Sequence, residues 1–483
     1  MTQGFAKKAV SSSVFLITRQ FGINIINFAG NLILARILIP ADFGLYAIIQ
    51  FVLSFLTLVG DGGLGAALIK KKGELKEDEL AAVFTFQQVF MTAITLIFIA
   101  ATFFLKPFVS DPSALLLFRI SALSYFMLSF RIVPVITLER NLHFGKIAVL
   151  EILEVVAFQA TAVTLAFMKA GALALVAGLV AKNIAMLMVL FFISDWKIKY
   201  KWDLKTVLPE IPFGLSFQGF HFINMLKDSF VPIFISSTLG MATVGFINWA
   251  GTLANYPLVA TGIISRILFP FFSKIQEDEE KLKKAIELIL SMSIFLVFGI
   301  LAVIWGMAKP ITRILYTEKW MPALVLFNYF IPANLISIMI APLISAFNAK
   351  GKANHNLVYA AVWAVLTWAL SWVLVPKFGM EGYGMATLIT SMVSLKYIYD
   401  AKKEFNISIK SALLPGFIAF VLVSALLRFT AVKYPAGSLA ILLVECAAGY
   451  AVYILLAVLF SGGHYLKGIR LIAKKAVEKE AES

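Results

Sequence analysis

Cysteine, histidine and charged residues are scarce in this sequence of 483 residues. It has one cysteine, Cys446, and four histidines, and only 14% of its residues are charged. A single cysteine forms no intrachain disulfide and no cysteine cluster for a metal. Four scattered histidines likewise do not favour a zinc site. Without a phosphate-binding loop of the Walker type or an acidic cluster typical of a glycosyltransferase, the sequence predicts no metal, no cofactor and no enzymatic activity.

Long polar stretches are also missing. Hydrophobic residues make up 60% of the chain, 43 positions are phenylalanine, and the mean hydropathy is +0.90. These values lie far outside the soluble range and predict an all-α polytopic membrane protein. A net charge of +15 would suggest a nucleic-acid partner for a soluble protein, but membrane orientation explains the basic excess here, so we expect no nucleic acid.

Residues 1–10 are polar and lead into a full-length span, which does not fit a cleavable signal peptide.

Runs of about twenty apolar residues, bounded by charges, glycine or proline, predict fourteen transmembrane helices. We expect an N-terminal six-helix lobe over residues 1–200, a second over 201–405, two additional helices within 406–462 and a cytoplasmic tail from 463 to 483. The predicted spans are 10–38, 43–69, 80–105, 113–138, 147–168, 172–193, 210–238, 243–272, 285–306, 322–347, 354–376, 382–400, 411–432 and 438–462.

Basic residues lie mainly on one side of these spans. The N-terminus, the even-numbered connections and the tail hold 26 of the 42 Lys and Arg residues, whereas the opposite side holds seven. By the positive-inside rule, the richer side and both termini are cytoplasmic. The short connections on the other side leave little room for an external catalytic domain. We therefore expect a multi-pass protein of the cell (inner) membrane, in contact with anionic lipids on its cytoplasmic face.

Two similar turns indicate an internal repeat. Residues 38–46 form the turn between the first and second predicted spans, and residues 239–247 form the turn between the seventh and eighth. Setting Gly44 on Gly245 gives an offset of 201. Six spans separate the copies, so the two lobes would have the same orientation in the membrane. Such lobes usually face one another across a central path.

The first span carries a line of amides. Ser13, Gln20, Asn24, Asn27 and Asn31 share one narrow face of a helix at 100° per residue. Amides without partners in hydrocarbon cost several kcal/mol each, so this face cannot contact lipid tails. It either bonds to polar groups of neighbouring helices or lines a wet transport cavity, and Asn24 and Asn27 are candidates for contact with a substrate.

Several basic residues lie within the predicted spans, where an ionisable group is costly and indicates function. Snorkelling to the cytoplasmic surface is an alternative for Arg19, and a structural ion pair with Glu154 is one for Arg131. Because the guanidinium fork suits phosphate, an excess of cations favours an anionic ligand. The basic residues that we expect to bind the substrate are Arg19, Arg119, Lys227 and Arg266, and Arg131 and Lys182 are further cations within the spans.

The seventh predicted span carries another polar face, formed by His221, Asn224 and Asp228 near the bilayer centre. A carboxylate there can exchange a proton or bind sodium, so we expect these residues to couple transport to an ion gradient of H⁺ or Na⁺. A fully hydrogen-bonded buried network would have the same sequence pattern.

Several segments resemble the Wzx-type polysaccharide flippases of the multidrug/oligosaccharidyl-lipid/polysaccharide exporter superfamily. The resemblance covers at least residues 10–400 and is carried by Ala35-Arg36-Ile37-Leu38 with Phe43-Gly44-Leu45-Tyr46, by 63–69, by Leu138-Glu139-Arg140-Asn141-Leu142-His143-Phe144, and by Ile264-Ser265-Arg266-Ile267-Leu268-Phe269-Pro270 with Ser273 and Gln276-Glu277-Asp278. It implies two six-helix lobes around a cavity, with two appended helices as in the related lipid II flippase.

The same resemblance implies a function. A polyprenyl-diphosphate-linked oligosaccharide, a precursor of cell-surface polysaccharide or lipopolysaccharide, would be moved from the inner to the outer leaflet by alternating access, with polysaccharide assembly proteins as further partners. It implies Arg19 and Arg266 as substrate residues. Unlike many drug exporters, the first span has Asn24 and Asn27 where an acid would be expected. A multidrug exporter and a membrane-embedded glycan polymerase or ligase are the alternatives.

Overall fold

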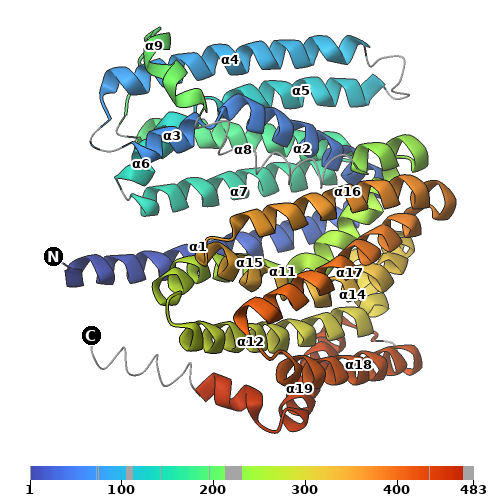
Figure 1. Cartoon of the computed structure of the whole chain (residues 1–483). Helices are drawn as coiled ribbons and strands as arrows, with labels where there is room; N and C mark the ends of the chain where they lie inside the picture. Colours follow the sequence, from blue (N-terminus) through green and yellow to red (C-terminus); the bar gives the residue numbers. More distant parts are fainter. Residues whose placement is uncertain are drawn as a thin grey trace. The chain divides into compact units, whose positions relative to one another are not determined.

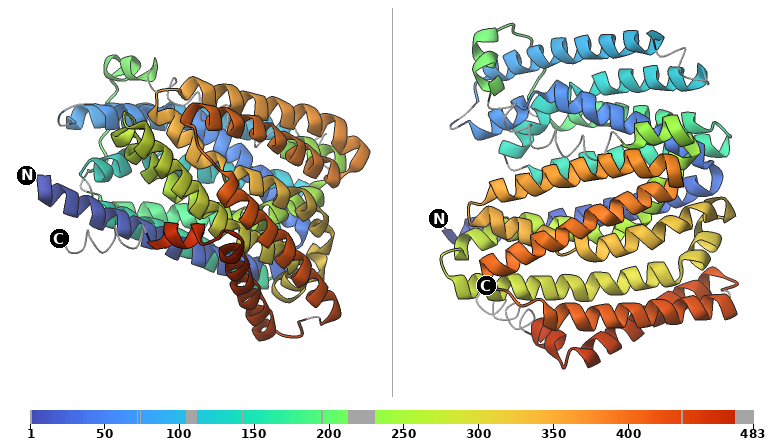
Figure 2. Two further views of the ribbon diagram at one scale, coloured as in Figure 1. Left: turned by 60° about the horizontal axis from the view of Figure 1, so that its bottom comes forward. Right: turned by 45° about the vertical axis from the view of Figure 1, so that its right-hand side comes forward.

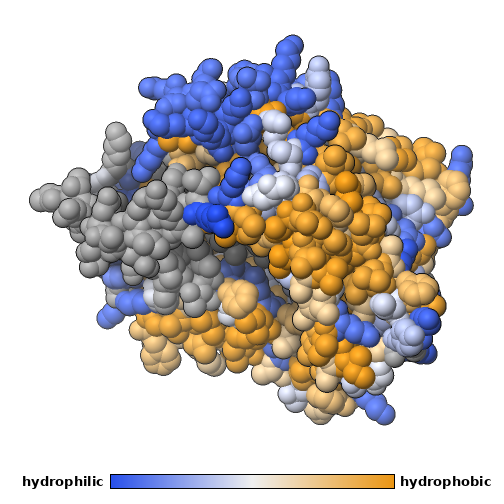
Figure 3. Space-filling model, turned by 90° about the horizontal axis from the view of Figure 1, so that it is seen from below, coloured by the Kyte–Doolittle hydropathy of each residue, from blue (hydrophilic) through white to orange (hydrophobic). Residues whose placement is uncertain are grey.

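The computed structural model describes residues 2–71, 73, 75–104, 112–141, 143–194, 196–212, 231–434 and 436–470, and within these it leaves aside the side chains of 2–18, 66, 70, 112, 259–267 and 270. The described chain is helical and contains no strand, which confirms the predicted all-α class. Ten helical segments of the described residues are long and apolar enough to cross a membrane. Their surfaces fit this setting, because Figure 3 shows apolar side chains over much of the face it displays.

Contacts divide the chain into two compact units, Met1–Gly245 and Phe246–Ser483. The boundary falls inside one long helix, whereas the sequence predicts a lobe boundary at residue 200. Figures 1 and 2 show that each unit is built from long helices lying side by side.

The first unit contains α1 (Thr2–Ile37), α2 (Pro40–Asp61), α3 (Leu64–Lys70), α4 (Glu77–Phe104), α5 (Pro112–Leu128), α6 (Ile132–Arg140), α7 (Phe144–Phe167), α8 (Ala172–Ile193), α9 (Leu204–Val207) and η2 (Leu208–Glu210), and residues 231–239 are helical.

The second unit takes most of α11 (Met241–Ile275), then α12 (Glu279–Gly306), α13 (Ala308–Ile311), the π-helix η3 (Thr312–Tyr316), the 3₁₀ segment η4 (Glu318–Leu326), α14 (Phe327–Ser337), α15 (Ile340–Ala349), α16 (Ala353–Phe378), α17 (Met380–Phe405), α18 (Lys410–Lys433) and α19 (Leu439–Phe460).

Three predicted spans are interrupted. The predicted helix 43–69 breaks between α2 and α3 at Gly62 and Gly63, whose φ angles of 54° and 70° lie in the left-handed region that glycine adopts readily. The predicted helix 113–138 is divided into α5 and α6, and 322–347 into η4, α14 and α15. Most of the predicted span 210–238 lies outside the described residues.

The start of α2 shows how local sequence sets a helix end. Pro40 occupies the first turn, where its missing N–H costs nothing, and the Asp42 carboxylate accepts a hydrogen bond of 3.1 Å from the backbone N–H of Ile39. These two features fix the residue at which α2 begins.

The predicted repeat has a physical counterpart in the first unit, where the first turns of α2 and α11 cross. A Cβ added to Gly44 would lie 1.9 Å from the carbonyl oxygen of Met241, and one added to Gly245 would lie 1.9 Å from that of Pro40. The separations 245 − 44 and 241 − 40 both equal the predicted offset of 201. The contact is therefore reciprocal, with equivalent positions touching each other.

Candidate substrate cavities in the first unit

Helices α7 and α8 are antiparallel neighbours and set the position of two opposite charges (Figure 1). They approach closely because α8 has a glycine at the contact: a Cβ on Gly178 would lie 3.0 Å from the Phe158 carbonyl oxygen and 3.1 Å from Ala162 Cβ. One turn from this contact in each helix stand Glu154 on α7 and Lys182 on α8. Each is ten residues from the start of its helix, roughly 15 Å along the axis and about halfway across a bilayer.

Glu154 forms ion pairs with two cations. Its Oε1 atom is bonded to the Arg131 guanidinium from the break between α5 and α6, and its Oε2 atom lies 3.9 Å from Lys182 Nζ. The Glu154 side chain is 6% exposed, whereas that of Lys182 is 38% exposed. The alternative of an Arg131–Glu154 ion pair is therefore the one that the structure shows. Lys182 is the cation that is least tightly held and most open to a ligand.

A second ion pair lies nearby. Arg19 of α1 approaches Glu151 of α7 at 3.2 Å, and the Arg19 side chain is only 10% exposed. Glu151 and Glu154 are three residues apart, so both face the same side of α7. The group thus contains three cations and two carboxylates.

All of these residues except Arg19 line a cavity of about 440 Å³, which we call the charged cavity. Its walls come from α1, α2, α4, α5, α6, α7 and α8, all within the first unit. In a low-dielectric interior, charge–charge interactions are stronger than in water, so a dianion placed here would meet a strong field. The polar lining residues are Gln20, Thr57, Arg131, Glu151, Glu154 and Lys182, and the apolar ones are Ile23, Met91, Leu128, Ile132 and Val155.

A second cavity, of about 570 Å³, adjoins the first, and we call it the hydroxyl cavity. It shares Thr57, Leu128 and Lys182 with the charged cavity. Two hydrogen bonds hold its walls together: Tyr125 donates to the Leu56 carbonyl at 2.7 Å, and Asn183 Nδ2 donates to Ser124 Oγ at 2.7 Å. Its remaining polar lining residues are Gln50, Ser54 and Asp61.

The amide face of α1 is partly tied to its neighbours. Gln20 Nε2 donates to Asn24 Oδ1 at 3.1 Å within the helix, and Gln159 Nε2 of α7 donates to Asn27 Oδ1 at 3.1 Å. The close packing depends on Gly30, where a Cβ would lie 2.0 Å from Gln159 Oε1. Asn27 therefore acts as an interhelical contact, while Gln20 faces the charged cavity.

The other predicted site residues are placed differently. Arg119 of α5 donates to Thr102 Oγ1 at 2.8 Å and lies 4.1 Å from the centre of the Phe103 ring, and it lines neither cavity. Arg266 is in α11, but its side chain is not described. Lys227 and the predicted coupling residues His221, Asn224 and Asp228 lie outside the described residues. Their roles stay predictions.

The site residues predicted from the sequence do not include Arg131, Glu151, Glu154, Lys182 or the polar residues of α2. Arg131 and Lys182 are predicted only as cations within spans, and Glu154 only as a possible partner of Arg131. Two acids spaced three apart in an otherwise apolar span were the available signal for Glu151 and Glu154. Gln50, Ser54 and Thr57 recur at three- and four-residue spacing, which places them on one face of α2. In the part of the chain that the structure describes, no three His, Cys, Asp or Glu side chains are placed to hold a metal ion.

Many long apolar helices around a polar, charged cavity are typical of a polytopic membrane protein that handles a polar ligand. Residues 33–325 match the family described as polysaccharide biosynthesis protein, and because this match covers more than half of the sequence, the chain belongs to that family. The predicted relationship to the exporter superfamily that contains the Wzx-type proteins is confirmed, and relatives of this chain are named as transport proteins and flippases.

Two relatives and one solved structure illustrate the relationship. The succinoglycan biosynthesis transport protein ExoT of Rhizobium meliloti (strain 1021) is 28% identical over 64% of this chain, and the match spans 62% of ExoT, less than two thirds of its length. The lipopolysaccharide biosynthesis protein WzxC of Escherichia coli (strain K12) is 24% identical, covering 67% of this chain and 66% of WzxC. The lipid II flippase MurJ in an inward closed conformation shares the fold, with a TM-score of 0.72 at 15% identity over 92% of this chain and 98% of that chain.

Proposed function

We propose that this protein moves a polyprenyl-diphosphate-linked oligosaccharide from the inner to the outer leaflet of the cell membrane, with both of its termini in the cytoplasm. The observation that carries this proposal is the charged cavity, where Arg131 and Lys182 line an open volume and Lys182 lies about halfway along α8. A diphosphate offers the oxygens that a guanidinium and an ammonium group bind best. The names of the family and of its relatives support a glycan-lipid substrate.

The carboxylates have a defined part in this proposal. In the empty cavity, Glu151 and Glu154 balance the cations, which lowers the cost of holding them in the membrane. An arriving diphosphate replaces Glu154 as the partner of Lys182, the most exposed of the cations. When the head group leaves, Glu154 pairs with Lys182 again, so the ammonium group is not left without a counter-charge. An ion gradient of H⁺ or Na⁺ drives the cycle, and assembly proteins receive the product.

The direct test is leaflet exchange in liposomes that contain the purified protein. A fluorescent polyprenyl-diphosphate sugar is placed in the membrane, and a quencher that cannot cross the bilayer reports how much lipid changes leaflet. We expect faster exchange than in empty liposomes and no new glycosidic bonds. Formation of polymer would instead identify a glycan polymerase, and export of organic cations without lipid exchange would identify a drug exporter.

Two variants connect this assay to the cavity. Lys182→Gln should reduce exchange at least about tenfold, because one charge-assisted contact to the diphosphate is lost. Lys201→Gln is the matched control: Lys201 is also paired with a carboxylate, that of Asp78, but it lies in the connection between α8 and α9 and lines neither cavity. Equal rates for the two variants would remove Lys182 from the head-group site.

A further inference from the structure

Arg428 is a cation near the end of α18 in the second unit, and it has no part in the proposed function. It follows Lys410, the first residue of α18, by 18 positions, which is roughly 27 Å along the axis, while the hydrocarbon core of a bilayer is about 30 Å thick. The guanidinium group therefore lies close to the membrane surface that the sequence predicts to be external. A charged group at this level needs polar partners.

The helix surface around Arg428 is exposed and apolar. Phe429, the next residue, is 64% exposed, and Val432, one turn further along, is 77% exposed. Ala425, one turn before Arg428, is also exposed, as is Arg428 itself. In a membrane these apolar side chains contact lipid, so the guanidinium group stands where the protein surface meets lipid molecules.

No carboxylate neutralises Arg428 within the described residues, because none of their ion pairs includes it. Its contacts are with neutral groups. Arg428 Nη2 donates to Asn328 Oδ1 at 3.4 Å, and the guanidinium carbon lies 5.1 Å from the centre of the Trp305 ring. A guanidinium group has five N–H donors, so most of them remain available to a ligand.

Three helices bring these side chains together. Helix α18 lies against α12 (Figure 1), and the two approach closely because a Cβ on Gly306 would lie 2.6 Å from Leu427 Cβ. Trp305 precedes Gly306 and Arg428 follows Leu427, so the close approach sets both side chains at the same level. Asn328 is the second residue of α14, which also contacts α12.

The neutral partners are themselves held in place. The Trp305 ring stacks on Phe420 at 5.6 Å between ring centres, and its Nε1 atom donates to Asn328 Oδ1 at 3.3 Å. Because Asn328 Oδ1 accepts from both Trp305 and Arg428, the Asn328 amide is oriented by two donors. Its Nδ2 group makes no hydrogen bond within the described chain, so two further N–H donors stand beside the guanidinium group.

We propose that Arg428, Asn328 and Trp305 form a binding site for the phosphate of a membrane phospholipid. One phosphate oxygen accepts from the guanidinium fork and another from the Asn328 amide, while the Trp305 ring supports the guanidinium face. A single cation matches the single charge of a phosphodiester. The acyl chains of this lipid follow Leu422 and Leu426, which are 47% and 48% exposed, toward the membrane centre.

The test counts lipids bound to the full chain by native mass spectrometry, with three probes: phosphatidylglycerol, the diacylglycerol with the same acyl chains, and polyprenyl diphosphate. For the native protein, we expect saturable binding of phosphatidylglycerol and much weaker binding of diacylglycerol, which has no phosphate. Arg428→Gln should weaken phosphatidylglycerol binding about tenfold, because one charge-assisted contact is lost.

Arg313→Gln is the matched control. Arg313 is another exposed arginine of the second unit, but its Nη2 atom is already bonded to the Glu318 carboxylate at 2.6 Å. This variant should bind phosphatidylglycerol as the native protein does.

A second variant tests the site without removing the arginine. Asn328→Asp keeps an acceptor for Trp305, replaces the amide donors and gives Arg428 a fixed counter-charge. It should therefore weaken phosphatidylglycerol binding at least as much as Arg428→Gln, and its unfolding temperature reports whether the fold is intact.

Three outcomes would overturn the site. These are equal affinity of the native protein and both site variants for phosphatidylglycerol, diacylglycerol binding as tight as that of phosphatidylglycerol, and an effect of Arg428→Gln on polyprenyl diphosphate but not on phosphatidylglycerol. The last result would assign the site to the transported lipid. The proposed function is tested separately, because the residues that line the charged cavity all belong to the first unit.

Discussion

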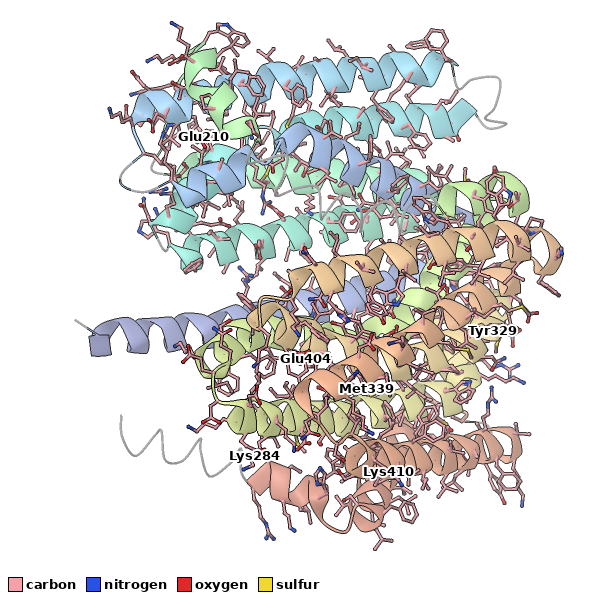
Figure 4. The ribbon with its side chains drawn as sticks, viewed as in Figure 1. Glu210, Lys284, Tyr329, Met339, Glu404 and Lys410 are labelled. Atoms are coloured by element: carbon pink, nitrogen blue, oxygen red, sulfur yellow. The ribbon has the colours of Figure 1, made fainter. Side chains whose placement is uncertain are left out.

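The two units keep their charged residues in different places. In the first unit, Glu154 and Lys182 stand halfway along their helices beside an open cavity. In the described part of the second unit, ion pairs lie in turns or toward helix ends, as for Arg313 with Glu318 and Lys352 with Glu404. Figure 4 places Glu404 and Lys284 on the opposite side of the second unit from Tyr329. This fits the prediction, because Glu404 and Lys284 lie in predicted cytoplasmic connections and Tyr329 lies near the external end of the predicted span 322–347.

The interior of the second unit is filled by apolar and aromatic packing. Two segments of the second unit, Glu279–Gly306 and Glu318–Ala349, bury 67% and 72% of an apolar stretch, whereas none of the five candidate spans of the first unit exceeds 44%. The other three candidate spans of the second unit bury 22%, 44% and 22%. Trp249 stacks on Trp320 at 5.2 Å between ring centres and on Phe327 at 6.0 Å. The comparison teaches that, among the described residues, the first unit places charges beside a cavity in the middle of its helices, while the second contains a close-packed aromatic core around Trp249 and Trp320.

A substitution that disrupts the aromatic core of the second unit should cause the largest loss in the free energy of unfolding. Trp320→Ala removes a side chain with no exposed surface and leaves a cavity against Trp249, so we expect a loss of about 3–5 kcal/mol in the free energy of unfolding. Chemical unfolding in lipid nanodiscs measures it. Trp372→Ala, at a tryptophan that is 64% exposed on α16, is the control and should cost much less. Similar losses for both would show that the core is not close-packed.

Neutralising Glu154, the carboxylate between two cations, should cause the next largest loss in the free energy of unfolding. Glu154→Gln leaves Arg131 and Lys182 without their shared counter-charge, and we expect a loss of about 3 kcal/mol in unfolding free energy. The double variant Arg131→Gln/Glu154→Gln should recover part of that loss, because the uncompensated charge is reduced. Glu77→Gln, at a surface pair with Lys199, is the control and should change little. Failure of the double variant to recover stability would contradict a role for charge balance.

A smaller effect is expected at the crossing of α2 and α11. Gly44→Ala forces a Cβ against backbone atoms that no side-chain rotation can move, which should cost about 1–3 kcal/mol. Gly145→Ala, in a helix of the same unit with nothing within 4 Å of the added atom, should be neutral or slightly stabilising. Thermal unfolding of the two variants compares them directly, and an equal response would mean that the crossing tolerates a wider separation.

The smallest expected effect is a pH-dependent loss of stability in the first turn of α12. The Lys281 ammonium group, 2.8 Å from the Asp278 carboxylate, lowers the pKa of Asp278, and a hydrogen bond of 3.0 Å from the Lys281 backbone N–H lowers it further. Because the folded-state pKa is depressed, the stabilisation is present at neutral pH and is lost as the pH falls through the acidic range below the ordinary value. Amide exchange in the first turn of α12 should speed up over that range in the native protein, after correction for intrinsic rates, but not in Asp278→Ala.

Sequence alone determined the features that depend on the average hydropathy and the spacing of residues close together in the chain. Mean hydropathy and run length give the all-α membrane class, and the amides of α1 and the charge at Glu154 identify polar faces, because lipid excludes unpaired polar groups wherever the helix lies. The repeat offset of 201 was also readable, and the reciprocal glycine contact fits it.

Tertiary structure decided which polar groups meet. Arg19 has the same sequence signature whether it binds a ligand, snorkels or pairs with Glu151, and its 3.2 Å contact depends on how α1 and α7 are rotated against each other. The approach of Lys182 to Glu154 depends on Gly178 one turn away, and the hydroxyl cavity exists only because α2, α5 and α8 leave space between them. Helical periodicity fixes the face on which a residue lies, but the distance between two faces is set by side-chain packing among helices far apart in sequence.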